Sequence, residues 1–480
     1  MDLLLPSPAP ALRHPTSPGP RDVWCPVLVG LLVAAGHAAV SLRIYSHLGC
    51  GMDLAIFDQG VRSLSQGHWP TSAMKSAGMN LCGDHFHPVI VLAAPLYWLW
   101  DDPRMLLIAQ AMALGVGCAV LVRTAQRLVP GRGPVPVAVL LGLGLAAAPG
   151  TQWAMVFDVH EVAFGVPLLA LSLAALREER WCAFTAWSLA VLLVKEDAGL
   201  LVAGLGGVVF LMGRRRLGAT LAAVAMAWTG LVLVVIIPAL SPTGQWLYRG
   251  AVGGPRASLH HVSQALLSPG LLTGTVAVML LATGLVALRS PLPLALLPSL
   301  AARLISGNPA YWGITYHYNL LPSVVLAFAT LDGMRRFAPR ARQRATALLV
   351  MAVMCSARYG AVGLRLRDHV DPGRVDAARE ALGVVPPAAR WRPMSSSPRT
   401  SPESIPQPNR SGPRGRPEGR TTGMTSAARW RHAGWCSTGT LPVMAARSTG
   451  YPRPWTTSTA RDGAPSTTGT VSWCSPADRL

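Results

Sequence analysis

The sequence predicts an all-α integral membrane protein, and three observations support this. Half of the 480 residues are hydrophobic (51%), only 13% are charged, and the mean hydropathy is +0.37. Apolar runs of the length that crosses a bilayer, roughly 17–25 residues, recur from Trp24 to about Arg358. They are built mainly of Ala, Leu, Val and Gly, the usual mixture for lipid-facing and helix-packing surfaces.

We expect a polytopic domain over residues 23–358, preceded by a disordered cytoplasmic leader, residues 1–22. About eleven crossings (ten to twelve) are predicted. They are 23–46, 105–127, 134–152, 163–177, 181–194, 199–213, 217–239, 270–288, 291–305, 320–333 and 344–358.

The long polar loop 46–104 after the first span decides the predicted topology. It contains a helix-like stretch, 54–64, and a short apolar segment, Val89 to Trp100, which we expect to lie in the interface or to re-enter. If that segment does not cross, a cytoplasmic N-terminus puts every arginine-rich loop inside, as the positive-inside rule requires. The polar motifs then gather on the outer face. If it does cross, the later loops invert.

The end of the chain changes character. Residues 359–385 are expected to begin an extracytoplasmic segment, with a helix from Val375 to Leu382. Residues 386–480 are rich in Arg, Ser, Pro and Gly and contain no Lys or Phe. They form either a disordered basic tail or, as we favour because of the scattered tryptophans, an out-of-frame translation of a GC-rich gene.

Charge and cysteine usage exclude several classes. The net charge of +20 arises from arginines in loops and in the tail, so no nucleic-acid partner is expected. The eight cysteines include no CxxC pair, which argues against structural zinc. Cys50 and Cys82 are either a disulfide across the first loop or two unrelated thiols. No phosphate-binding loop, nucleophile elbow or HExxH motif occurs.

The first loop carries two groups of candidate site residues. Asp53 and Asp58 are each a candidate general base at the membrane face, or else an ordinary cap or loop aspartate. Asp84, His85 and His87 combine a carboxylate with two imidazoles, which suits a divalent metal or a phosphate, although such residues are also common in solvated loops. No other cofactor is implied.

Three further polar groups interrupt the later apolar sequence. The first, between two spans, comprises Asp158, His160 and Glu161. The second, within an apolar run, is Lys195, Glu196 and Asp197, a functional site or a tight surface hairpin. The third is the segment from Tyr311 to Asn319, where an interfacial aromatic belt explains the tyrosines but not His317.

Five stretches in this order resemble the bacterial membrane-protein family known as domain of unknown function 2079. They are MDLAIFDQGVRSLSQG, GDHFHPVIVLAAPLYWL, FDVHEVAFGVPLLAL, LLVKEDAGLL and YHYNLLPSVV. The resemblance covers about residues 40–335 and extends toward 385. The stretch after 386 matches nothing in the family, in keeping with a shifted frame.

That family is in turn distantly similar to polytopic glycosyltransferases of the GT-C type, which use a polyprenyl-phosphate sugar and a catalytic acid in the first outer loop. The resemblance implies Asp53 as general base with Asp58 as the alternate. Asp84, His85 and His87 would orient the acceptor or a metal, although the adjacent acidic pair of many such enzymes is absent. Lys195 would neutralise the lipid phosphate, and His317 and Tyr318 would line the donor pocket.

The leading hypothesis is therefore sugar transfer at the outer face of the cell membrane, with the lipid bilayer and a polyprenyl-phosphate sugar as partners. One alternative is a transporter or flippase in which Lys195, Glu196 and Asp197 form a charge-coupled site. The other is an envelope assembly protein without chemistry of its own.

Overall fold

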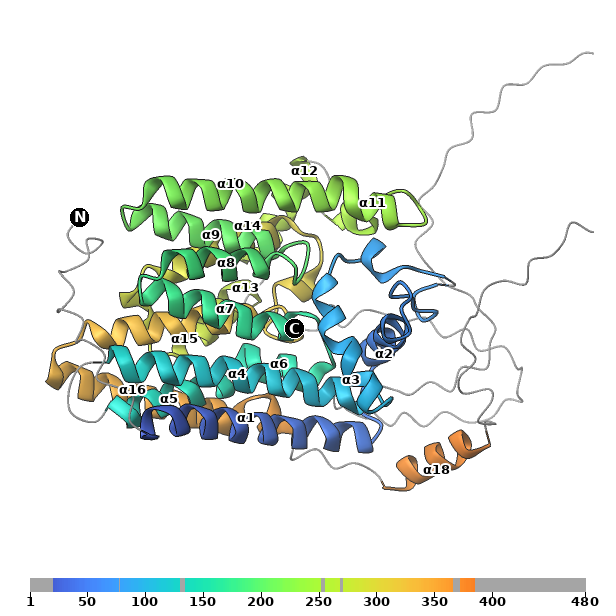
Figure 1. Cartoon of the computed structure of the whole chain (residues 1–480), viewed down its shortest axis with the longest axis horizontal. Helices are drawn as coiled ribbons and strands as arrows, with labels where there is room; N and C mark the ends of the chain where they lie inside the picture. The colour runs from blue at the N-terminus through green and yellow to red at the C-terminus, as the bar shows by residue number, and fades with distance from the viewer. Residues whose placement is uncertain are drawn as a thin grey trace, which may run out of the picture. The chain divides into compact units, whose positions relative to one another are not determined.

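The computed structural model describes residues 20–76, 78–129, 134–251, 255–267, 271–365 and 372–384, and these form helices joined by short connections (Figure 1). No strand is assigned within those ranges, where Thr71 and Asn80 form an isolated antiparallel bridge. The predicted all-α class is confirmed for them. The predicted tail, 386–480, and most of the leader lie outside the described residues.

The helices follow one another with few long gaps. Their bounds are α1 Pro20–Ser46, α2 Met52–Ser65, α3 Ala94–Leu99, α4 Arg104–Leu128, α5 Pro134–Ala147, α6 Pro149–Phe157, α7 Val162–Arg177, α8 Trp181–Val191, α9 Ala198–Leu211, α10 Arg215–Leu231, α11 Ile237–Leu240, α12 Pro255–Leu267, α13 Leu272–Leu281, α14 Leu297–Ile305, α15 Leu320–Arg335, α16 Pro339–Tyr359, α17 Ala361–Arg365 and α18 Pro372–Gly383. A π-helical turn, Val232–Ile236, joins α10 to α11.

Four helical segments are long and apolar enough to cross a membrane: Val23–Ser46, Arg104–Leu128, Arg215–Leu240 and Pro339–Leu364. Two bent pairs raise the number to six if each is one span: α5 with α6, bent by 48°, and α12 with α13, bent by 49°. Other apolar helices, α7, α8 and α9 among them, have 10–17 residues. The structure thus supports several apolar spans, and the segment between the predicted spans 217–239 and 270–288 contains α12.

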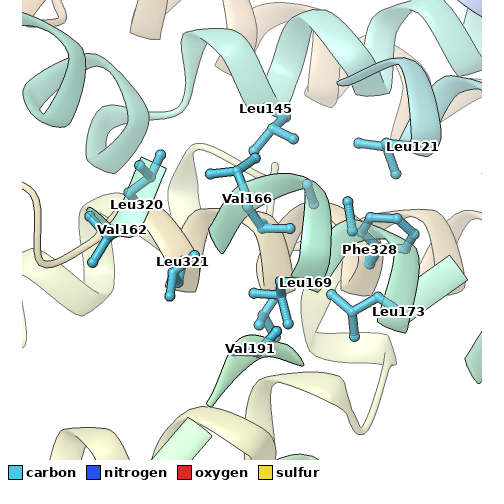
Figure 2. Packing of buried hydrophobic residues seen from close by; sticks show 14 of the residues in the cluster. Leu121, Leu145, Val162, Val166, Leu169, Leu173, Val191, Leu320, Leu321 and Phe328 are labelled. Carbon is cyan, nitrogen blue, oxygen red and sulfur yellow. The ribbon is translucent and has the colours of Figure 1, made fainter. Parts of the chain in front are cut away.

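Helix α7 lies at the centre of the apolar core. Val162, Val166, Leu169 and Leu173 recur along it at helical spacing and are all buried. Figure 2 shows these side chains among Leu121 of α4, Leu145 of α5, Val191 of α8 and Leu320, Leu321 and Phe328 of α15. Helix α7 thus packs on α4, α8 and α15.

The predicted first loop is about half helical. Helix α2 includes the expected helical stretch 54–64 and buries Leu54, Phe57 and Val61. The segment Pro88–Leu99 is a 3₁₀ turn followed by α3, and both parts pack on α2. Its length falls below the roughly 20 residues that a crossing helix needs. Trp98 and Leu99 project from it, 71% and 80% exposed.

Arginines connect the other ends of these helices, which we call the arginine end. Arg127 of α4 contacts Glu178 just after α7 at 3.1 Å, and Arg177 of α7 lies 3.6 Å from Asp332 of α15. Arg214, before α10, stacks over Trp181 of α8 at 4.6 Å. Both α7 and α15 therefore end here.

Two smaller predictions concern single segments. Helix α18 contains the helix expected from Val375 to Leu382. Cys50 and Cys82 are both free thiols, so the disulfide alternative is wrong and the separate-thiol alternative holds in this structure.

Candidate functional site

A polar cavity of about 250 Å³ lies where α7 and α15 begin, and residues of α2 and of the rest of the first loop form part of its wall. This is near the lower end of the range for small-molecule sites, roughly 300–1,000 Å³. Its lining residues come from all five stretches singled out in the sequence. They are Asp53, Ile56, Phe57, Lys75, Leu81, Asp84, His85, His87, Phe157, His160, Glu161, Lys195, Tyr248, Asn308, Ala310, Tyr311, Tyr316, His317 and Tyr318.

The centre of the cavity wall is a carboxylate beside two stacked imidazoles. Asp53 Oδ2 lies 3.4 Å from His160 Nε2. The His160 ring stacks on the His317 ring with centroids 3.7 Å apart and planes 25° apart. These three residues come from α2, the α6–α7 turn and the segment before α15. The fold therefore brings together side chains more than 250 positions apart in the sequence.

Asp158 fixes the start of α2, and hence Asp53. The backbone N–H of Gly51 donates to both carboxylate oxygens of Asp158, at 2.9 and 3.1 Å. A Cβ on Gly51 would lie 2.9 Å from Asp158 Oδ2, so this approach needs glycine. Gln110 of α4 donates to the Asp158 carbonyl oxygen at 3.1 Å. Asp158 is a positioning residue at the edge of the cavity.

The pKa values of Asp53 and Asp158 are shifted in opposite directions. Burial raises the pKa of Asp53, but the hydrogen bond and charge of His160, with the charge of Lys75, outweigh it, so the net pKa is lowered. Burial dominates at Asp158 and raises its pKa to about 6, although the Gly51 N–H opposes this. Asp53 is thus a carboxylate at neutral pH.

A strained connection holds His317. Tyr316 has φ +68°, a left-handed conformation that is uncommon for a residue with a side chain. Its ring meets Phe157 edge-on at 4.7 Å. Arg303 of α14 fastens this segment by donating to Asn319 Oδ1 at 2.7 Å and to the Tyr318 carbonyl oxygen. Such strain persists only where surrounding contacts enforce it.

The three consecutive charged residues after α8, Lys195, Glu196 and Asp197, lie in three different environments. Lys195 Nζ pairs with Glu161 Oε1 at 2.7 Å, both largely buried. Despite burial, this attraction lowers the pKa of Glu161 and raises that of Lys195. Glu196 accepts from His85 Nδ1 at 2.5 Å, whereas Asp197 is exposed. The three side chains therefore have different direct partners, and of the three Lys195 alone lines the cavity.

Asp84, His85 and His87 likewise have separate partners. Asp84 pairs with Lys75 at 2.9 Å and accepts from the Tyr248 hydroxyl at 2.9 Å. His85 stacks on Tyr248 at 4.5 Å, and His87 packs on Phe57 at 5.5 Å. Their different partners do not support the metal alternative for these three residues. Within the described residues, no group of three or more His, Cys, Asp or Glu side chains has the arrangement of a metal site.

Two buried imidazoles in the wall have no hydrogen-bond partner among the described residues. His87 is 4% exposed and His317 7%, and in each ring neither nitrogen is bonded. His160 likewise has a free Nδ1, since its only polar contact is Nε2 to Asp53. Buried polar groups without partners are uncommon in folded proteins, so this wall is built to meet a ligand or water.

Nine of the thirteen predicted site residues line the cavity: Asp53, Asp84, His85, His87, His160, Glu161, Lys195, His317 and Tyr318. The other four lie behind or away from it. Asp58, the alternate base, faces α3, where it accepts from the Tyr97 hydroxyl at 2.7 Å and pairs with Arg62 at 3.0 Å. Asp158, Glu196 and Asp197 act as described above.

Sequence reasoning missed Lys75 and Tyr248. A signal for Lys75 existed, because the chain has only two lysines and both line this cavity. Tyr248 belongs to no motif and reaches the site through Asp84 and His85.

The fold and the cavity define a helical membrane protein with a polar site at one end of its helices. The family model described as predicted membrane protein, domain of unknown function 2079, matches residues 43–360, and the chain belongs to that family. No curated protein and no solved structure matches the chain.

Proposed function

We propose that this protein is a GT-C-like membrane glycosyltransferase that moves a sugar from a polyprenyl-phosphate donor at the outer face of the cell membrane. The observation that supports this most is Asp53, an ionised carboxylate 3.4 Å from His160, in a polar cavity at one end of an apolar helix bundle. A carboxylate in that setting can take a proton from an acceptor hydroxyl.

In the proposed step the acceptor oxygen attacks the anomeric carbon of the donor sugar. Its proton passes to Asp53, and the carbon–oxygen bond to phosphate breaks with its electron pair leaving on the polyprenyl phosphate. The configuration at the anomeric carbon inverts. His160 is the positioning residue that keeps the Asp53 carboxylate directed into the cavity.

The lysines provide positive charge for the leaving phosphate, since cations held near a developing negative charge stabilise it. Lys195 is 12% exposed and held by Glu161, whereas Lys75 is 28% exposed and held by Asp84. The phosphate therefore meets Lys75 first, and Lys195 contributes through its field.

The proposed topology has about eleven crossings, with the N-terminus cytoplasmic and the segment 359–385 extracytoplasmic. Its support is the separation of polar groups along α7 and α15, which begin at the cavity and end at the arginine end. Arginine-rich ends favour the cytoplasm, so the cavity would face outward.

Asp53→Asn tests the chemistry, with Asp58→Asn on the same helix as its matched control. Membranes containing either variant are assayed with a panel of labelled polyprenyl-phosphate sugars. We expect Asp53→Asn to lower transfer by roughly 10²–10⁴-fold, the usual contribution of a general base. Asp58→Asn should change transfer only in proportion to folded protein. Absence of transfer from every donor, or full activity of Asp53→Asn, would refute the proposal.

Single-cysteine reporters test the topology in intact cells. Met74→Cys, at a side chain 46% exposed, lies in the first loop, and Arg215→Cys is at the arginine end. A membrane-impermeant maleimide should label the first and not the second. The native cysteines are first replaced by serine, and the opposite pattern would place the cavity in the cytoplasm.

A further inference from the structure

We infer that His87 and His317 form the subsite for the donor's sugar ring, their ring nitrogens hydrogen-bonding its hydroxyl groups. This rests on the proposed function and deepens it by dividing the cavity into a part that binds the sugar and a part that binds the phosphate.

The support begins with burial without partners. Both imidazoles line the cavity, both are more than nine-tenths buried, and all four of their nitrogens are free of hydrogen bonds within the described chain. Leaving a buried polar group unpaired carries the full cost of its desolvation. A ligand that pairs them recovers that cost on binding.

The protonation state of these rings selects the ligand chemistry. Burial lowers the pKa of His87 to about 4, and burial with the charges of His160 and Lys195 lowers that of His317 well below its ordinary value. A neutral imidazole offers one N–H donor and one acceptor. A sugar hydroxyl also donates and accepts, whereas an ionised phosphate only accepts.

Aromatic rings surround the same two imidazoles. The ring centroids of His317 and Tyr318 lie 4.2 Å apart, and those of Tyr318 and Tyr316 lie 6.2 Å apart. His87 packs on Phe57, which reaches His160 at 5.9 Å. Apolar ring faces next to paired donors and acceptors suit a ligand that has both C–H faces and hydroxyl edges. Lys75 instead pairs with Asp84 and lies 3.5 Å from the Tyr248 hydroxyl, and Lys195 pairs with Glu161.

The experiment compares two probes on the full-length protein in nanodiscs. One probe is a set of farnesyl phosphates that bear single hexoses or pentoses, and the other is bare farnesyl phosphate. The sugar-bearing probe that wild type binds best is used for the comparison. We expect His317→Phe and His87→Phe each to lower the affinity for this probe by about tenfold, which corresponds to the loss of one to two hydrogen bonds. Neither variant should weaken bare farnesyl phosphate more than twofold.

Controls separate the subsite from collapse of the cavity. His260→Phe, at an exposed position on α12, should alter neither affinity. Lys75→Met should weaken both probes. If His317→Phe and His87→Phe weaken both probes equally, or neither, the subsite assignment is wrong.

The same measurements distinguish this inference from the proposed function. Sugar-dependent binding that needs His317, without transfer to any acceptor, would keep the subsite and refute the enzyme. If the protein transfers sugar but its preference among sugars is unchanged in His317→Phe and His87→Phe, the enzyme is kept and the subsite is refuted.

Discussion

The two ends of α7 and α15 both contain paired buried charges, such as Arg177 with Asp332 and Lys195 with Glu161, but Asp332 and Asp53 differ in the number of their partners. At the arginine end, Asp332 Oδ2 receives the Ser290 hydroxyl at 2.8 Å and Arg336 at 3.2 Å, with Arg177 at 3.6 Å. One carboxylate thus gathers three partners. At the cavity end, Asp53 has one, His160, and the nearby imidazoles of His87 and His317 have none.

This difference separates a structural cluster from a candidate site. A buried carboxylate with three partners in place needs no ligand, because the protein already compensates its desolvation. A wall with unpaired polar groups around an open cavity leaves that compensation to a ligand. The two ends should therefore respond differently to substitution, the arginine end in stability and the cavity end in binding and turnover.

Asp332→Asn, at the arginine end, should have the largest effect on stability. Removing the carboxylate leaves Arg177 and Arg336 without their shared partner, and loss of one member of a buried pair costs roughly 3–5 kcal/mol. We expect the free energy of unfolding to fall by about that amount in detergent, while transfer per folded molecule stays unchanged. Asp53→Asn is the matched variant. It should lose less than about 1 kcal/mol, because Asp53 is 32% exposed. Equal destabilisation of the two variants would contradict the distinction.

Asp158→Asn tests whether burial controls the titration of a positioning residue. The pKa of Asp158 in the fold, about 6, lies above the ordinary value of about 4, so folding favours its protonated form. Its contribution to stability is complete below pH 4 and is lost as the pH rises through 6. That loss is at most about 3 kcal/mol.

Asparagine keeps the shape and an acceptor for the Gly51 N–H but cannot ionise. We therefore expect the difference in Tm between Asp158→Asn and wild type to grow in favour of the variant from pH 4.5 to pH 7.5. Other carboxylates with lowered pKa values, such as Asp84, cancel in this difference. A difference that does not vary with pH would show that Asp158 is ionised throughout.

Much of the fold followed from the sequence because apolar length and loop charge are local signals. The helical class, α2 and the short segment before α4 were all predicted from composition and spacing. The bend of 48° between α5 and α6 was not, although Pro149 lies at the break. Nor was the helix α12, whose sequence is amphipathic without a long apolar run.

The candidate site was predicted as a set of residues but not as an arrangement. Ionisable residues inside apolar sequence are costly, so His160, Glu161 and Lys195 could be selected one by one. Which carboxylate pairs with which cation depends on helix packing. Glu161 rather than Glu196 binds Lys195 because α7 begins where α8 ends. The choice of Asp53 over Asp58 depends on the face of α2 that meets α3, a tertiary contact with no local signal.

The smallest effect that we expect is a gain in stability rather than a loss, and it tests directly whether the cavity end is built for a ligand. His317→Phe removes a buried ring with two unpaired nitrogens and replaces it with an apolar one that the adjoining cavity can accommodate. We expect the free energy of unfolding without ligand to rise by about 1 kcal/mol, because sites built for a ligand often lower stability. Thermal unfolding of the ligand-free protein measures it, and His160→Phe is the matched variant. That substitution also removes the contact with Asp53 and should give no gain. A loss of stability in His317→Phe would mean that the imidazole is already satisfied within the fold, and the cavity end would then resemble the arginine end.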